Sequence, residues 1–273
     1  MTEIKNPLEI YKALPRTNCG HCGVPSCMAF AAAVFQGMKI ISGCPYLEKK
    51  IAEQLSTKII VKRRTMDDEQ WEVIRQLKKE IQDFDLTTVA LRIGAQIRNG
   101  KLAITCLGKN FFIDQTGEMT STCHINHWIY IPLLHYIIEC QGTEPKNDWI
   151  SFSELPDAKE WNQYFTHRCE EPLRKLADTH RELLFELFFL FEAQPQATAG
   201  KADYSLLLKP LPKVPFLINY WLADDGFPSE LNILLDRSAG RNINAHSITL
   251  LARGIIEMFR QLIVSHSREG KLF

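Results

Sequence analysis

The chain of 273 residues is long enough for one large domain, or for a small domain followed by a larger one. Because 45% of its residues are hydrophobic and 23% are charged, the composition is that of a globular protein and excludes general disorder. The 32 Lys and Arg residues balance the 32 Asp and Glu residues, so no overall positive charge attracts nucleic acid or an anionic membrane. We therefore expect no nucleic-acid partner.

The N-terminal residues, MTEIKNPLEIYKALPRT, lack the basic segment, apolar segment and cleavage site of a secretory signal. The longest apolar run, residues 183–193, contains two glutamates and is shorter than the ~20 residues that span a bilayer. We therefore expect a cytoplasmic protein without a membrane span. In that compartment, clustered cysteines are more often metal ligands or redox groups than disulfides.

Four of the eight cysteines lie in residues 14–47, which read LPRTNCGHCGVPSCMAFAAAVFQGMKIISGCPYL. Cys19, Cys22, Cys27 and Cys44 have the spacing C-x2-C-x4-C-x16-C, so three come from one loop and the fourth follows a predicted helix. The two glycines of the loop permit positive φ and let backbone N–H groups approach the sulfur atoms. The predicted helix places Cys27 in its first turn, where the helix dipole favours a thiolate.

This spacing favours a [4Fe-4S] cluster over a zinc ion. Structural zinc sites usually pair two short Cys-x2-4-Cys knuckles, whereas here three cysteines crowd one loop and the last stands alone. Such crowding is typical of iron–sulfur ligation. Zinc and four unligated buried thiols stay open as the alternatives.

The stretch LPRTNCGHCGVPSCMAFA, with the later G and CP, resembles the iron–sulfur domain of the corrinoid iron–sulfur protein large subunit, over roughly residues 1–60. Ser26 stands where that family commonly has Thr. The resemblance implies that the four cysteines bind a low-potential [4Fe-4S] cluster that passes single electrons. It also implies anaerobic metabolism and a redox or corrinoid protein as partner, with a corrinoid or other tetrapyrrole as a further cofactor.

The remaining chain predicts an α+β fold. In chain order the expected segments are a polar linker at 61–68, a helix at 69–84, strands with Asn-Gly and Thr-Gly turns at 87–120, helices at 125–140 and 157–193, strands at 204–240, and a terminal helix with an Asn cap from 244. Because strands and helices come in separate groups, we expect antiparallel strands rather than βαβ units. No Gly-rich phosphate-binding motif occurs, which argues against nucleotide binding.

The predicted organisation is a small, mainly helical iron–sulfur domain at 1–60, the linker at 61–68, and a larger mixed α+β domain at 69–273. The segments WISFSELP, LPKVPFLINYW and FPSELNILLDRSA resemble a domain of unknown function from anaerobic prokaryotes, over about residues 70–270. That domain is often fused behind this iron–sulfur module. The resemblance implies a domain organisation and a redox setting, and identifies no catalytic residue.

A second candidate site combines Cys123 with His124, His127 and His135. On one helix the three histidines fall at positions 0, 3 and 11, which gives them roughly a shared face that could ligate haem or cobalt. An amphipathic helix with partly buried histidines explains the same residues, and we prefer that interpretation.

The sequence DTHREL at residues 178–183 resembles the D-x-H-x-x-G signature with which some corrinoid proteins supply a histidine to cobalt. Leu183 replaces the glycine of the signature, and the segment lies within a predicted helix rather than after a strand. We therefore interpret it as a solvated helix face.

Three functions are compatible with these features. The first is a redox protein that transfers single low-potential electrons to a partner or to a bound tetrapyrrole. The second is a cluster-dependent reductive enzyme whose active site lies in residues 69–273. The third is a binding module in which the cluster only stabilises a small domain. The step from the cluster to cobalt rests on the resemblance alone.

Overall fold

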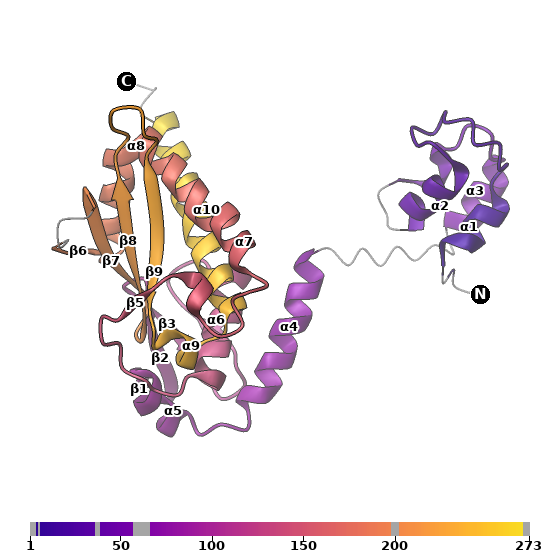
Figure 1. Ribbon diagram of the computed structural model, residues 1–273. Coiled ribbons are helices and arrows are strands. Elements are labelled where there is room, and N and C mark those ends of the chain that lie inside the picture. The colour runs from indigo at the N-terminus through magenta and orange to yellow at the C-terminus, as the bar shows by residue number, and fades with distance from the viewer. Residues whose placement is uncertain (1–3, 5, 36–38, 57–65, 198–201, 270–273) are drawn as a thin grey trace. The chain divides into compact units, whose positions relative to one another are not determined.

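The computed structural model describes residues 4, 6–35, 39–56, 66–197 and 202–269. The chain divides into two compact units, Met1–Glu69 and Gln70–Phe273, each with its own hydrophobic core (Figure 1). Of the linker expected at 61–68, residues 61–65 lie outside the described residues, and residues 66–68 begin helix α4 (Met66–Ile81).

The regular elements of the first unit, among its described residues, are helices. They are α1 (Pro7–Ala13), α2 (Cys27–Phe35), the 3-10 helix η1 (Ile41–Gly43) and α3 (Lys49–Ser56). The side-chain oxygen of Asn6 caps α1 by accepting a hydrogen bond from the N–H of Glu9 at 3.3 Å. The prediction of a mainly helical N-terminal region is confirmed.

The second unit contains two antiparallel sheets. The first has the order β1-β2-β3-β4 and comprises β1 (Gln96–Arg98), β2 (Lys101–Cys106), β3 (Lys109–Ile113) and β4 (Met119–Thr120). Strands β2 and β3 form a hairpin in which Leu102 pairs with Ile113 and Ile104 with Phe111. All four side chains are buried. The alternating apolar residues that predicted these strands therefore lie on the face of the sheet that packs against the core.

The second sheet has the order β5-β9-β8-β7-β6. It comprises β5 (Trp149–Ile150), β6 (Gln194–Pro195), β7 (Tyr204–Leu211), β8 (Val214–Trp221) and β9 (Glu230–Asp236). The two sheets are joined where the N–H of Leu107 donates a hydrogen bond to the carbonyl of Pro210 at 3.3 Å. The predicted α+β class with antiparallel strands is confirmed.

Helices cover the sheets of the second unit. Besides α4 they are α5 (Leu86–Ile93), α6 (His127–Glu139), η2 (Phe152–Glu154), α7 (Asn162–Phe165), the π-helical turn η3 (Thr166–Glu170), α8 (Glu171–Leu190), α9 (Ala239–Asn242) and α10 (Ala245–Glu269). Helices α8 and α10 run along one face of the second sheet (Figure 1) and meet at Phe188 and Phe259, whose ring centres lie 5.1 Å apart. The expected cap of α10 is present, because Asn244 Oδ1 accepts a hydrogen bond from the N–H of Ser247 at 2.8 Å. Within the described ranges, no helix has the length and apolar character needed to cross a membrane.

Helix α5 corrects the prediction of strands from residue 87 onward. Asp85 caps this helix by accepting hydrogen bonds from the N–H groups of Thr87 and Thr88, and Gly94 ends it with φ 73°. The apolar residues buried by α5 recur at helical spacing: Leu86, Val89, Ala90 and Ile93. The Thr and Val residues favoured a strand locally, but the two caps and the buried stripe outweigh that preference.

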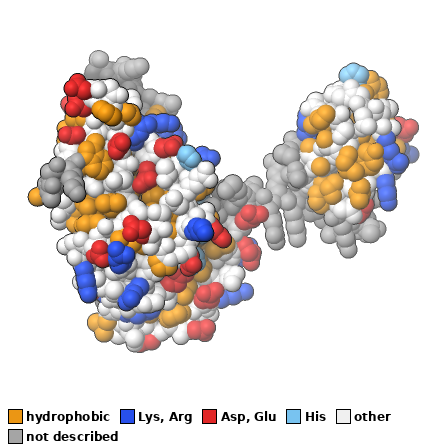
Figure 2. Space-filling view, in the orientation of Figure 1, with side chains coloured by type: hydrophobic (Ala, Val, Ile, Leu, Met, Phe, Trp, Pro, Cys, Tyr) orange, Lys and Arg blue, Asp and Glu red, His pale blue; other side chains and the backbone are white. Residues whose placement is uncertain are grey.

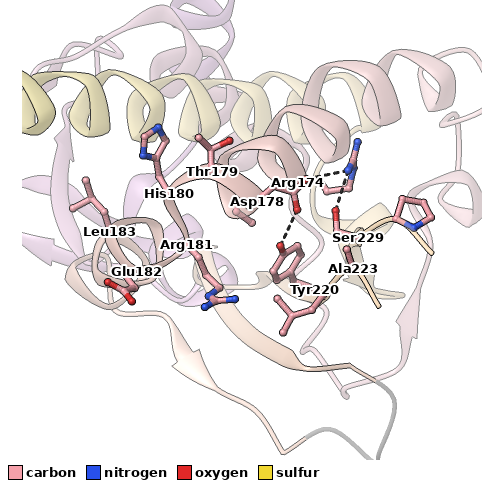
Figure 3. A pocket seen from close by; sticks show the side chains of 13 residues that line it. Arg174, Asp178, Thr179, His180, Arg181, Glu182, Leu183, Tyr220, Ala223 and Ser229 are labelled. Atoms are coloured by element: carbon pink, nitrogen blue, oxygen red, sulfur yellow. Dashed lines mark hydrogen bonds and ion pairs between the residues drawn. The ribbon is translucent and has the colours of Figure 1, made fainter. Parts of the chain in front are cut away.

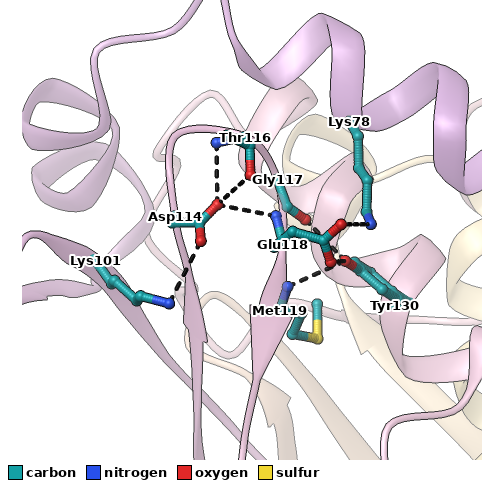
Figure 4. A network of polar contacts seen from close by, with 8 residues as sticks. All are labelled: Lys78, Lys101, Asp114, Thr116, Gly117, Glu118, Met119 and Tyr130. Atoms are coloured by element: carbon teal, nitrogen blue, oxygen red, sulfur yellow. Dashed lines mark hydrogen bonds and ion pairs between the residues drawn. The ribbon is translucent and has the colours of Figure 1, made fainter.

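A polar network fixes α4 to the turn between β3 and β4 (Figure 4). Lys78 Nζ lies 2.6 Å from Glu118 Oε1 and 5.1 Å from the centre of the Tyr130 ring. The Tyr130 hydroxyl donates to the carbonyl of Gly117 at 2.9 Å. Asp114 closes the turn by accepting the N–H of Glu118 at 3.1 Å. These contacts join three elements that are distant in sequence.

Candidate metal centre

The cysteine loop of the first unit turns sharply around Cys22. The N–H of Gly23 donates a hydrogen bond to the carbonyl of Gly20 at 2.9 Å, and both glycines have positive φ, 73° and 74°. Residues with a Cβ rarely adopt this conformation, so the loop that the glycines predicted is present. Cys19 precedes this tight turn and Cys22 lies within it.

Asn18 ties the start of this loop to the start of α2. Its side-chain oxygen accepts a hydrogen bond from the backbone N–H of Cys27 at 2.8 Å, although the two residues are nine positions apart. Ser26 caps the same helix, because its hydroxyl accepts the N–H of Ala29 at 3.1 Å. Cys27 is therefore held in the first turn of α2, as the sequence predicted. The role of Asn18 had no sequence signal beyond its place before Cys19.

The four cysteines differ in their exposure to solvent. Cys27 and Cys44 are buried, Cys22 is half-buried and Cys19 is exposed, and all four are free of disulfides. The three less exposed cysteines belong to one hydrophobic cluster together with residues such as Phe30. The four thiols thus range from buried in an apolar core to exposed at the surface.

Hydrogen bonds favour ionisation of the exposed thiol of Cys19. Hydrogen bonds from the backbone N–H of His21 and from the Thr17 side chain lower its pKa, because both stabilise the thiolate. By contrast, burial raises the pKa of Cys106 and of Cys169 in the second unit to about 12. Those two thiols stay protonated and serve as small apolar core groups.

A lysine places positive charge beside the loop. Lys39 Nζ donates a hydrogen bond to the backbone carbonyl of Cys22 at 2.9 Å. A Cβ built on Gly23 would lie 3.1 Å from the same nitrogen, so the ammonium group packs directly on the loop backbone. A cation in this place favours anionic sulfur groups at the loop.

The side of the loop that faces solvent carries a ring pair. The hydroxyl of Tyr46 lies 3.0 Å from His21 Nδ1, and the two ring centres are 5.6 Å apart. Both residues are exposed, so His21 is a surface residue linked to the segment that follows Cys44.

The donor set suits an iron–sulfur cluster in its chemistry: four free thiols, of which three lie in an apolar cluster. Across the residues that the structure describes, no three His, Cys, Asp or Glu side chains are grouped so that they could hold a metal ion. A cubane takes one thiolate on each of its irons, so its ligands surround a body larger than a single ion. Ligation by these cysteines is taken up below as a proposal.

The residues of the second candidate site have different surroundings. Helix α6 begins at His127, so Cys123 and His124 precede it and the expected helix face does not include His124. His135 is on the helix, where its Nδ1 lies 2.6 Å from the hydroxyl of Ser247 on α10. This contact joins two helices, as expected for a partly buried histidine in a packed interface.

Comparisons with known proteins identify both parts of the chain. Residues 85–258, more than half of the chain, match the family described as "Domain of unknown function (DUF3786)". Residues 14–46 match the family described as "Putative Fe-S cluster". No solved structure matches the chain significantly.

Curated relatives match less than half of the chain. The acetyl-CoA decarbonylase/synthase complex subunit gamma 1 of Methanosarcina thermophila is 52% identical over 56 residues, which are 20% of this chain and 12% of that protein. The corrinoid/iron-sulfur protein large subunit of Moorella thermoacetica is 48% identical over 48 residues, 18% of this chain and 11% of that protein. The subunit gamma of Methanocaldococcus jannaschii is 29% identical over 123 residues, 41% of this chain and 25% of that protein. The match thus spans a quarter or less of the length of these relatives.

Proposed function

Because the chain belongs to the DUF3786 family and carries an iron–sulfur cluster domain similar to that of the corrinoid iron–sulfur protein large subunit, we propose that it transfers single low-potential electrons. The acceptor is a partner redox protein, a corrinoid protein or a bound tetrapyrrole. The setting is anaerobic metabolism in the cytoplasm.

The ligands in this proposal are Cys19, Cys22, Cys27 and Cys44. The observation that carries it is the arrangement of these thiols on one turn, one helix start and one following segment, with three of them in a single apolar cluster. When bound, a [4Fe-4S] cluster supplies one-electron redox chemistry.

The protein groups around the cysteines have separable roles. The apolar side chains of the core, among them Phe30 and Ile41, exclude water from the buried thiols. Lys39 offsets negative charge at the loop through its position on the Cys22 carbonyl. Exclusion of water and nearby positive charge both shift the reduction potential of a bound cluster, so these residues set the energy of the transferred electron.

A partner can approach the loop over exposed apolar side chains. Met28 adjoins Cys27 in sequence, Ile40 and Tyr46 flank Cys44, and all three side chains are at least 38% exposed. Figure 2 shows hydrophobic side chains gathered on the visible face of the first unit. The relatives named as complex subunits act within assemblies, which supports a protein partner for this chain as well.

The test is delivery of electrons by the full chain. Anaerobically purified protein is reduced with titanium(III) citrate, freed of excess reductant and mixed with aquacobalamin, whose visible spectrum reports its reduction. We expect the wild-type chain to reduce the corrinoid, and the Cys44→Ala variant, treated identically, to fail. A chain that binds iron and sulfide but cannot be reduced, or that transfers no electron to aquacobalamin or to methyl viologen, would contradict the proposal.

A further inference from the structure

A cleft of 960 Å³ opens in the second unit between α8 and the end of the second sheet (Figure 3). One wall is formed by Arg174 and residues 177–183 of α8, and the other by residues 222–223 and 228–229, which lie on the two sides of the turn between β8 and β9. Tyr220 on β8 lies between the two walls. The volume is in the range of sites that hold small organic ligands.

The helical wall is broken where the sequence predicted a continuous helix. His180 has φ −136° and ψ 42°, so α8 consists of two helical segments that meet at this residue. The break falls inside DTHREL, the segment interpreted above as a solvated helix face. It places Asp178 before the kink and Arg181 after it, and both line the cleft.

Each oxygen of the Asp178 carboxylate has a protein partner. Arg174 Nη1 lies 3.0 Å from Asp178 Oδ2, and the Tyr220 hydroxyl donates to Asp178 Oδ1 at 2.8 Å. Burial, together with the neighbouring carboxylate, raises the pKa of Tyr220 to about 12, so its hydroxyl stays protonated near neutral pH. The negative charge of Asp178 in the cleft is therefore compensated by Arg174.

Arg181 is a cation for which no ion pair with a carboxylate is seen among the described residues, and it lies over an aromatic ring. Its guanidinium carbon lies 5.8 Å from the centre of the Tyr204 ring. That ring stacks on Tyr220, with ring centres 6.2 Å apart. In the view of Figure 3 the Arg181 side chain is drawn between those of Glu182 and Tyr220.

The cleft thus combines a guanidinium that lies over a tyrosine ring with an apolar surface from side chains such as Leu183, Leu222 and Pro228. Arg174 adds further N–H donors, because only its Nη1 is used by Asp178 and Ser229. An arginine fork matches the paired oxygens of carboxylates and phosphates. We propose that this cleft binds an organic anion, a carboxylate or a phosphate ester, with the anionic group on Arg181 and the organic part against the apolar wall. The site is independent of the four cysteines.

The test is calorimetric titration of the full chain with four simple probes. Benzoate and phenyl phosphate carry a ring and an anion, inorganic phosphate carries only the anion, and benzyl alcohol carries only the ring. We expect saturable one-to-one binding of benzoate, of phenyl phosphate or of both, at least about tenfold tighter than that of either partial probe. Comparison of the two aromatic anions shows whether the site prefers a carboxylate or a phosphate.

Two arginine variants make the test specific to the cleft. Arg181→Gln should weaken binding of the preferred probe about tenfold, the loss expected for one charged hydrogen-bonding group. Arg168→Gln is the matched control, because Arg168 also lies over a tyrosine ring, that of Tyr164 at 6.0 Å, but outside the cleft. Arg181→Lys keeps the charge without the fork and should fall between wild type and Arg181→Gln.

Three results would overturn the proposal: no saturable binding of either aromatic anion, equal binding of benzyl alcohol, or an equal loss of affinity in Arg168→Gln and Arg181→Gln. Circular dichroism of each variant establishes that the second unit is folded. If Arg181→Gln does not fold, Arg181→Lys carries the comparison, and unchanged affinity in that variant counts against a forked contact at Arg181.

Discussion

The two units differ in how much apolar surface holds each of them together. Among the described residues, the core of the first unit consists of nine buried residues, two of which are Cys27 and Cys44, whereas that of the second consists of 53. Small domains bury little apolar surface and often depend on metal ligation for their stability. We infer that the first unit folds with the help of the proposed cluster and that the second does not need it.

The largest effect is expected from Cys44→Ala. Loss of one ligand should remove the cluster and unfold the first unit, because the ligand that follows the helix is as necessary as those in the loop. Iron per chain should fall from about four to near zero, and amide exchange should become fast in residues 6–56 while residues 70–269 stay protected.

The matched control is Cys123→Ala, which removes a half-buried thiol of the second unit. It should leave the iron content unchanged. A cluster retained in Cys44→Ala, or lost in Cys123→Ala, would contradict both the ligand assignment and the difference between the units.

The second unit should be sensitive to packing instead. At Gly254 on α10 a Cβ would overlap the indole ring of Trp128 on α6. Gly254→Ala should therefore destabilise this unit by about 1–2 kcal/mol, since overpacking costs more than the ~1 kcal/mol that alanine gains in a helix. Urea unfolding followed by circular dichroism measures the loss.

The double variant Gly254→Ala with Trp128→Leu is the control for that packing effect. Removing the indole should make the effect of the alanine smaller than it is in the wild-type background. A Gly254→Ala variant that is more stable than wild type would show that α6 and α10 do not pack as described.

The fold was predictable where the pattern was local and repeated. Apolar residues alternate along β2, as at Leu102 and Ile104, and this pattern predicts the hairpin of β2 and β3. Asn244, a residue that favours the N-cap position, predicts the start of α10. Helix α5 was not predicted, because its Thr and Val residues favour a strand and its selection depends on the burial of one face. Such burial is a property of the folded unit rather than of the segment.

The candidate sites were predictable to a similar degree. The four cysteines stand out by spacing alone, but the role of Asn18 as a link to the N–H of Cys27 depends on a contact across nine residues. The break of α8 at His180 had no signal, since no proline or glycine marks it. The cleft beside this break is lined by α8 and by the ends of the segment between β8 and β9. These two parts of the chain are distant in sequence and lie together only in the folded unit.

A smaller effect is expected from Lys39→Gln in the first unit. Removing the cation that lies on the Cys22 carbonyl should make the reduction potential more negative, by on the order of 50 mV, because the reduced state carries one more negative charge. Potentiometric titration measures the shift. Lys50→Gln, a change at an exposed lysine of α3, should leave the potential almost unchanged, and equal shifts in the two variants would exclude a specific role for Lys39.

The smallest effect concerns pH and the second unit. Burial lowers the pKa of His135, partly opposed by the carboxylates of Glu139 and Glu80. A lowered pKa in the folded state means that the unfolded state binds the proton first, so stability should fall as the pH drops below about 6.5. The slope attributable to this histidine should stay below about 1.4 kcal/mol per pH unit.

His135→Phe tests this origin, because phenylalanine keeps a ring and cannot take a proton. Urea unfolding at several pH values between neutral and mildly acidic should give a flatter profile for the variant than for wild type. Identical profiles would show that other groups, such as the nearby His246, control the acid sensitivity.

The central claim is that Cys19, Cys22, Cys27 and Cys44 hold a redox-active [4Fe-4S] cluster. Its most direct test is an anaerobic reductive titration of the full chain, with iron and sulfide counted in the same sample and electron paramagnetic resonance recorded at each step. The account predicts about four iron and four sulfide per chain and a reversible uptake of one electron at low potential. Stoichiometric zinc without iron, or a cluster that takes up no electron, would contradict it.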